Sequence, residues 1–262
     1  MKYLQQDLKQ RKCYGRTPDS IKAVRPMKDG VIADFTGTQL MLKNIIKKIC
    51  QRYNAGKPRV VVGVPSGITE VEERAVEESV LQAGAKEVYL IEEPMAAAIG
   101  ANLEVSEPSG SIIVDIGGGT TEVAVISLGG IVVSNSLRIA GDELDQDILN
   151  YVKRELNLAI GETAAEQIKM EIGCATPLMT EAQMQISGRD LTTGLPKDMI
   201  ITSTQVEEAM RESISEIVDV VKATLEKTPP ELASDIVEKG IVLAGGGALI
   251  KNIDKLLSLK TE

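Results

Sequence analysis

The sequence predicts a protein of the layered α/β class, arranged as two α/β halves. Three observations support this prediction. Residues 60–64 and 88–91 form short apolar strand patterns, and a helix pattern follows each of them. A second set of strands begins at 112–115 and ends at 241–244. The chain has 262 residues, of which 43% are hydrophobic, and this length can bury the core of one large domain or of two smaller ones.

The first block is predicted to alternate strand, helix, strand and helix. After the first strand, Thr69 and Glu72 have the spacing of a capping box, so a helix should begin there. After the second strand, Glu92, Glu93 and Pro94 interrupt the apolar pattern before a helix of small residues. The expected helices run to about Gly84 and over 95–100.

The second block is predicted to open with an antiparallel meander, after a turn-rich loop at 107–110 that is a plausible domain boundary. Its strands are expected over 112–115, 121–127 and 131–139. The middle strand has a period-2 alternation, which is typical of a β-strand.

The rest of the chain is predicted to be mostly helical. Thr204 and Glu207 have capping-box spacing ahead of a long amphipathic helix, which Pro229 and Pro230 stop. The expected elements are helices over 142–156 and 163–172, a short strand near 184–186, the long helix to about Lys227, a strand over 241–244 and a helix from about Ala248.

The composition excludes several kinds of chemistry. No histidine occurs in the sequence, which rules out Ser-His-Asp and Cys-His catalysis and histidine-ligated metals. One phenylalanine, five tyrosines and a net charge of −9 work against nucleic acid as a partner. Cys13, Cys50 and Cys174 form no CxxC pair and indicate reduced thiols. Without a membrane-span or signal-peptide pattern, the chain is expected to be cytoplasmic.

Three consecutive glycines, Gly117, Gly118 and Gly119, follow the strand that ends in Asp115 and have two explanations. One is a tight hairpin that needs positive φ angles. The other is a cradle of backbone amides for phosphates, because only residues without Cβ let the main chain approach an anion closely. In the second case, Asp115 would hold Mg²⁺, usually through water.

A second glycine triplet, Gly245, Gly246 and Gly247, follows the last strand and precedes a helix. It too has two explanations, a second set of amides directed at a ligand or close packing of the strand on the helix. Neither triplet fits the Walker A or GxGxxG pattern. Together, at two strand ends, they suggest one nucleotide held from two sides.

Two pairs of charged residues also have a structural and a functional interpretation. Glu92 and Glu93 could be ordinary solvated loop carboxylates. Alternatively, one of these glutamates, held in place by the following Pro94, orients a water for phosphoryl transfer. Glu166 and Lys169, three residues apart on a helix, form a surface ion pair or grip a ribose.

Several strings together resemble the MreB and Mbl family of bacterial actin homologues, from about Gly15 onward. They include EEPMAAAIGAN at 92–102, DIGGGTTEVAVISLGGIV at 115–132, GRDLTTGLP at 188–196 and GIVLAGGGALIKNIDKLL at 240–257. The resemblance implies an actin-like, ribonuclease H-like two-domain ATPase fold with a nucleotide cleft between its halves.

The same resemblance implies a function. The family's members are cytoskeletal ATPases that polymerise into filaments at the inner face of the cytoplasmic membrane. They direct cell-wall synthesis and rod cell shape, and their partners are further copies of themselves and membrane proteins of cell-wall elongation. The implied cofactors are ATP or ADP with Mg²⁺.

The family's functional residues can be carried over where the strings match. Glu93 matches the glutamate that positions the attacking water, Thr120 the threonine near the γ-phosphate, and Asp115 lies where the metal is held. The implied nucleotide-binding residues are Gly117, Gly118 and Gly119 for phosphates, Glu166, Gln167, Ile168 and Lys169 for ribose and base, and Gly245, Gly246, Gly247 and Ala248 for adenosine.

The sequence also departs from the family pattern. The family's opening Asp-x-Gly-Thr phosphate motif does not occur in it, and the last connecting helix is not matched after Glu262. The first domain is therefore expected to be incomplete, with hydrolysis below the family's rate. The alternative function is a truncated nucleotide-binding scaffold without hydrolysis or independent polymerisation. The expected domains are a partial lobe at 1–33, a first α/β domain at 34–103, a second at 104–140 and 206–262, and an inserted lobe at 141–205.

Overall fold

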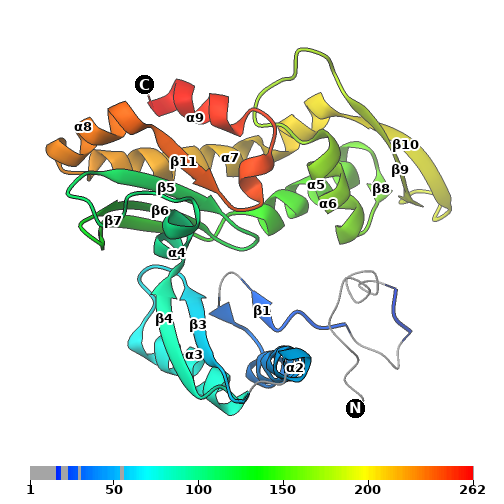
Figure 1. Ribbon diagram of the computed structural model, residues 1–262. Helices are drawn as coiled ribbons and strands as arrows, with labels where there is room; N and C mark the ends of the chain where they lie inside the picture. The colour runs from blue at the N-terminus through cyan, green and yellow to red at the C-terminus, as the bar shows by residue number, and fades with distance from the viewer. Residues whose placement is uncertain (1–15, 19–22, 29–30, 54–55, 262) are drawn as a thin grey trace. The chain divides into compact units, whose positions relative to one another are not determined.

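The computed structural model describes residues 16–18, 23–28, 31–53 and 56–261 (Figure 1). The chain forms two compact units, Met1–Ala96 and Ala97–Glu262. Cys13 and much of the lobe expected at 1–33 lie outside the described residues. The division into units falls before the boundary expected after residue 103, and the lobe expected at 141–205 stays a prediction.

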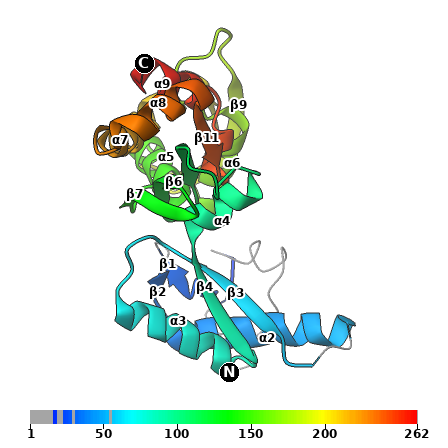
Figure 2. The ribbon, with the colours of Figure 1, turned by 60° about the vertical axis from the view of Figure 1, so that its left-hand side comes forward.

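The first unit is built around two parallel strands, β3 (Arg59–Val64) and β4 (Glu87–Glu92), which lie side by side in Figure 2. Helix α3 (Glu70–Gln82) connects them and packs on β4 and on α2 (Phe35–Tyr53). A short antiparallel pair, β1 (Met27–Lys28) and β2 (Val31–Ile32), precedes α2. The predicted order of strand, helix and strand is confirmed.

The capping box predicted for α3 is present. The Glu72 amide donates to Thr69 Oγ1 at 3.3 Å, and the Thr69 amide donates to Glu72 Oε2 at 2.8 Å. The two side chains therefore satisfy two amides that the first turn of a helix leaves without partners.

Helix α4 (Glu93–Gly100) follows β4 directly. The loop expected at Glu92, Glu93 and Pro94 is wrong, because β4 ends at Glu92 and the helix begins at Glu93. Pro94 fits the first turn of the helix, where an amide has no intrahelical acceptor in any case. Glu93 is thus placed by a helix and not by a flexible loop.

The second unit has a four-stranded sheet of order β11-β5-β6-β7, visible in Figure 1. The antiparallel meander is confirmed by β5 (Ser111–Ile116), β6 (Thr121–Ser127) and β7 (Gly130–Leu137). Strand β11 (Ile241–Ala244) joins β5 in parallel, with Ala244 opposite Asp115.

Strand β6 is buried on both of its faces. All seven residues of β6 are buried, because β5 and β7 flank the strand and helix α7 (Ser203–Glu226) packs across it. The charged Glu122 is accommodated there by the Ser136 hydroxyl, which donates to its Oε1 at 2.6 Å. Alternation in β6 therefore marks two different buried faces.

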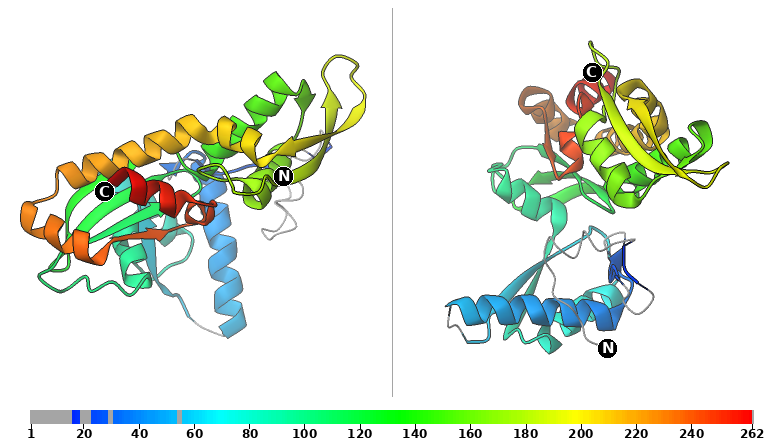
Figure 3. Two further views of the ribbon diagram at one scale, coloured as in Figure 1. Left: turned by 90° about the horizontal axis from the view of Figure 1, so that it is seen from above. Right: turned by 90° about the vertical axis from the view of Figure 1, so that its right-hand side faces the viewer.

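Residues after the meander form a smaller antiparallel sheet with helices beside it. The sheet has the order β10-β9-β8, and Figure 3 shows β9 and β10 as a long hairpin. The short strand expected near 184–186 is longer than predicted, and its two partners were not predicted. The elements are α5 (Gly141–Glu155), β8 (Leu158–Ala159), α6 (Glu162–Ile172), β9 (Gln183–Asp190) and β10 (Pro196–Thr202).

The cap of α7 differs from the predicted one. Thr202, and not Thr204, is the N-cap, and its box partner is Gln205, and not Glu207. The Gln205 amide donates to Thr202 Oγ1 at 3.3 Å. Glu207 is instead buried and accepts two hydrogen bonds from Arg211.

Removal of this cap gives a test of the assignment. We expect Thr202→Ala to lower the free energy of unfolding by about 1 kcal/mol, because the Gln205 amide loses the Thr202 hydroxyl that accepts its hydrogen bond. Thr204→Ala, at an exposed position within the helix, should stay within about 0.5 kcal/mol of the parent. Urea unfolding of both variants measures the difference, and a larger loss in Thr204→Ala would contradict the assignment.

The end of the chain contains more structure than predicted. Pro229 and Pro230 do stop α7, but they also begin α8 (Pro230–Lys239), which was not predicted. The helix expected from about Ala248 begins later than predicted. A short 3-10 helix, η1 (Gly247–Leu249), comes first, and the helix α9 (Ile253–Thr261) follows it. No described helix is long and apolar enough to cross a membrane.

Candidate functional site

The two glycine triplets lie at the carboxyl ends of neighbouring parallel strands. Gly117, Gly118 and Gly119 follow β5, and Gly245, Gly246 and Gly247 follow β11, which pairs with β5 in register. The end of a parallel pair, where two connections leave the sheet, is a common place for ligands in α/β proteins. Both triplets are therefore brought to one edge of the second unit.

The first triplet is not required by backbone strain. None of its glycines has a positive φ, so the hairpin explanation that depends on positive φ is wrong for this loop. The Gly117 amide donates to the Thr120 carbonyl at 2.9 Å and closes the turn. A Cβ on Gly118 would meet nothing within 4 Å. Gly118 therefore faces open space that the chain itself does not fill.

In the second triplet two glycines are closely packed and one faces open space. Gly245 has φ +82°, and a Cβ there would meet the Ile116 carbonyl and the Asp115 carboxylate. A Cβ on Gly247 would overlap the Ile116 side chain. Close packing was one of the two explanations given for this triplet, and it accounts for Gly245 and Gly247. Packing does not require a glycine at Gly246, since a Cβ there would meet nothing within 4 Å.

Amide groups at both loops are available to an anion. Among the described residues, no acceptor receives a hydrogen bond from the amides of Gly118 and Gly119. Gly246 is the N-cap of η1, and the first amides of a helix have no acceptor inside it. Two sets of amides without side chains in front of them form the kind of cradle that binds phosphate.

Asp115 is a half-buried carboxylate beside both loops. Among the described residues it has no hydrogen-bond or ion-pair partner for its side chain, and burial raises the pKa of its carboxyl above 3.8, the ordinary value. No group of three or more acidic or cysteine residues that could hold a metal occurs in the described parts of the chain. The set fits Mg²⁺, which binds through one or two carboxylates, water and phosphate oxygens.

The raised pKa gives a test without any ligand. The pKa of Asp115 is higher in the folded protein than in the unfolded chain, because burial disfavours the charged carboxylate. The Asp115 side chain therefore lowers the free energy of unfolding increasingly as the pH rises from 3.8 through the folded pKa. We expect Asp115→Asn to be more stable than the parent at pH 7 and to lose this advantage on acidification. Urea unfolding between about pH 4 and pH 8 measures it, and an advantage that does not vary with pH would contradict burial of the charged carboxylate as its cause.

The amino end of α5 holds the first glycine loop in place. The amides of Gly141 and Asp142 donate to the carbonyls of Gly117 and Gly118, at 3.1 and 2.7 Å. The loop carbonyls are thereby turned toward α5, which leaves the loop amides for another partner. Sequence reasoning missed these contacts, because Gly141 and Asp142 carry them through the backbone.

Lys169 of α6 in turn fixes α5. Its Nζ lies 2.8 Å from Asp145 Oδ1 and donates to the Gly141 carbonyl at 2.5 Å. The side chains of Lys169 and Asp145 are only 13% and 14% exposed. Lys169 therefore does not serve mainly as a surface partner of Glu166. Its side chain links α6 to α5, next to the first glycine loop.

The other residues expected on α6 differ in their access to a ligand. Glu166 is half-buried, and Gln167 is exposed with its amide donating to Glu171 at 2.8 Å. Ile168 is 0% exposed and belongs to the hydrophobic core of the second unit. Its side chain therefore packs against the protein and does not reach a ligand, and this part of the expectation is corrected.

The remaining expected residues are placed by the same elements. Thr120 is the last residue before β6 and is buried, and Ala248 is half-buried within η1. Glu93 belongs to the first unit, where its Cγ lies 3.3 Å from the position of a Cβ on Gly63. The absence of a side chain at Gly63 leaves room for the stem of Glu93, whereas Glu92 is exposed at the end of β4.

Comparisons with known proteins match most of the chain. A family model described as MreB/Mbl protein matches residues 8–262. The chain is 55% identical over 248 residues to the cell shape-determining protein MreB of Escherichia coli K12, covering 94% of this chain and 72% of that protein. It is 50% identical to the cell shape-determining protein Mbl of Bacillus subtilis, with 95% and 74% covered.

Solved structures show the same likeness. MreB5 of Spiroplasma citri bound to ADP has a TM-score of 0.88 and 43% identity, covering 94% of this chain and 74% of that chain. The same protein bound to AMPPNP has a TM-score of 0.86. The MamK double helical filament, at 22% identity and a TM-score of 0.74, is alike in fold alone.

The fold and these likenesses define the class of protein: it is an actin-like α/β protein with glycine loops at the ends of parallel strands. Within that class, the chain belongs to the MreB/Mbl family.

Proposed function

We propose that the chain binds ATP or ADP with Mg²⁺ through the second unit. The observation that carries the proposal is the open space in front of Gly118 and Gly246, at the ends of two neighbouring strands. Neither glycine is needed for the backbone or for packing, whereas a nucleotide bound at the two loops needs both to lack side chains. The ADP and AMPPNP complexes of the Spiroplasma citri protein support the choice of an adenine nucleotide.

Each residue has a distinct part in this proposal. The amides of Gly118 and Gly119 bind phosphate oxygens, and Thr120 lies near the γ-phosphate. Asp115 binds Mg²⁺ through water, and the metal supplies charge neutralisation for phosphoryl transfer when it is bound. The amides at Gly246 and the exposed part of α6 contact the adenosine. Glu93 orients the attacking water.

The proposed role in the cell is that of an actin-like cytoskeletal ATPase. The chain polymerises with further copies of itself into filaments at the inner face of the cytoplasmic membrane, where it directs cell-wall synthesis with membrane proteins of wall elongation. The relatives named cell shape-determining proteins support this role, since the chain covers 72–74% of their length at 50–55% identity.

Calorimetry tests the nucleotide proposal directly. Titration of the chain with ATP, ADP and GTP, each with and without Mg²⁺, should show ATP and ADP binding that Mg²⁺ strengthens. Asp115→Asn should lose about tenfold in affinity with Mg²⁺ present and little without it. Absence of binding at millimolar ATP would overturn the site. Electron microscopy of the same samples tests for filaments.

A contrast between adjacent glutamates tests the hydrolytic role. We expect Glu93→Ala to slow phosphate release from ATP by about a hundredfold or more while nucleotide affinity stays nearly constant, because a group that orients water acts mainly in the transition state. Glu92→Ala, at the exposed end of β4, should leave turnover unchanged. Single-turnover phosphate release of both variants measures this, and equal rates in the two would refute the assignment.

A further inference from the structure

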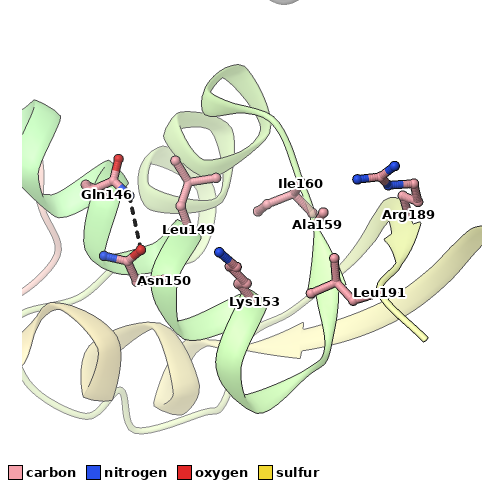
Figure 4. A pocket seen from close by; sticks show the side chains of 8 residues that line it. All are labelled: Gln146, Leu149, Asn150, Lys153, Ala159, Ile160, Arg189 and Leu191. Carbon is pink, nitrogen blue, oxygen red and sulfur yellow. Dashed lines mark hydrogen bonds between the residues drawn. The ribbon is translucent and has the colours of Figure 1, made fainter. Parts of the chain in front are cut away.

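A separate cavity lies in the second unit, between α5 and the strands β8 and β9. Its volume is about 370 Å³, which is within the range of small-ligand pockets. Figure 4 shows side chains from these elements turned toward it. The lining residues are Gln146, Leu149, Asn150, Lys153, Ala159, Ile160, Arg189 and Leu191. None of them belongs to the glycine loops or to the residues assigned to the nucleotide.

The charge of this pocket is opposite to that of the chain. The chain carries a net charge of −9, yet the described residues that line the pocket include two cations and no acid. Neither Lys153 nor Arg189 has an ion-pair or side-chain hydrogen-bond partner among the described residues. In Figure 4 the Lys153 ammonium and the Arg189 guanidinium both point into the pocket. Two such cations attract a carboxylate.

The rest of the lining has features that suit a peptide. Leu149, Ile160 and Leu191 supply an apolar surface, and in Figure 4 Ile160 and Leu191 lie between the two cations. The Gln146 amide donates to Asn150 Oδ1 at 3.1 Å. That bond uses one donor and one acceptor, so the pair still offers the Gln146 oxygen as an acceptor and the Asn150 nitrogen as a donor. One acceptor beside one donor complements a peptide group.

From these contacts we infer that the pocket is a docking site for an acidic peptide segment of a protein partner, in which an aspartate or glutamate stands next to an apolar residue. One acidic side chain pairs with Lys153 and a second one with Arg189, an apolar side chain covers Leu149 and Ile160, and the backbone bonds to the Gln146–Asn150 pair. The charge complementarity of the pocket favours this occupant over a basic or a neutral one.

A binding assay with a defined probe tests the inference. A fluorescein-labelled peptide, Asp-Leu-Glu-Leu-Asp, is titrated with the whole chain and followed by fluorescence anisotropy. We expect saturable binding that weakens with added salt, and a loss of about tenfold or more in Lys153→Gln/Arg189→Gln. The matched control is Arg154→Gln, which removes a neighbouring cation that pairs with Glu155 and does not line the pocket; it should bind as the parent does.

Two further arms separate the possible outcomes. The uncharged peptide Asn-Leu-Gln-Leu-Asn should not bind, and free 4-methylpentanoate, which has the carboxylate and the apolar group but no peptide group, should compete only weakly. The inference is overturned if the acidic peptide does not bind at about 1 mM chain, if Arg154→Gln loses as much affinity as the double variant, or if either the neutral peptide or the free carboxylate binds equally well. Circular dichroism verifies that each variant is folded.

Discussion

Gly118→Val should abolish nucleotide binding while the protein stays folded. The Cβ of Gly118 would meet nothing within 4 Å, and its φ is not positive, so the chain can accommodate a side chain there. The same side chain would stand in front of the amides that we assign to phosphate. We expect the affinity for ATP with Mg²⁺ to fall by about a hundredfold or more, measured by calorimetry, with an unchanged urea midpoint.

Two other glycines serve as controls for this result. Gly130→Val, at the exposed start of β7, should keep both fold and affinity, since its Cβ would lie 3.8 Å from the nearest atom, the Ser127 carbonyl oxygen. Gly245→Ala should instead destabilise the fold, because it combines a positive φ with overlap of the Ile116 carbonyl. If Gly118→Val unfolds the protein or binds ATP normally, the assignment of the first loop is wrong.

Lys169→Met should both destabilise the second unit and weaken nucleotide binding. The substitution removes the ammonium group that pairs with Asp145, whose side chain is 14% exposed. It also removes the hydrogen bond that the Gly141 carbonyl accepts from Lys169 Nζ. Breaking one side of such a pair costs about 3 kcal/mol. The end of α5, which holds the carbonyls of Gly117 and Gly118, would then be less firmly placed. We expect a lower urea midpoint together with about tenfold weaker ATP binding.

A double-mutant cycle separates this pair from general damage. Asp145→Asn combined with Lys169→Met should cost less than the sum of the two single changes, because each removes the same interaction. Lys153→Met, at an exposed lysine of α5 without a partner in the described chain, should leave the urea midpoint within experimental error. Additive losses in the cycle would show that Lys169 acts through contacts other than Asp145.

The fold could be predicted from the sequence where local pattern and chain direction decide the structure. The capping box at Thr69 and Glu72, the meander from β5 to β7 and the strand β11 were all found this way. At α7 the same reasoning failed, because two threonines two residues apart each have a suitable partner three residues on, and burial of Glu207 decides between them. Local spacing does not report that burial.

The site could be predicted only in outline. A run of three glycines does not show which member is there for packing and which faces open space, yet the structure separates Gly245 from Gly246 in that respect. The ion pair of Lys169 with Asp145 joins two helices, so spacing along one helix suggested Glu166 instead. Ile168 matched the family string at a position that proves to be core. Tertiary contacts decide all three cases.

The place of β11 beside β5 also determines when the site can exist. Strand β5 and the first glycine loop leave the ribosome early, whereas Gly246 and its loop follow only after α5, α6, α7 and α8 have been made. Until then β5 has only β6 as a neighbour, and half of the proposed nucleotide site is missing. Synthesis proceeds at about 5–20 residues per second, so a nascent chain spends several seconds in that condition. At the proposed site, nucleotide should therefore not assist early folding of the second unit, and we expect it to stabilise the chain only after β11 has joined the sheet.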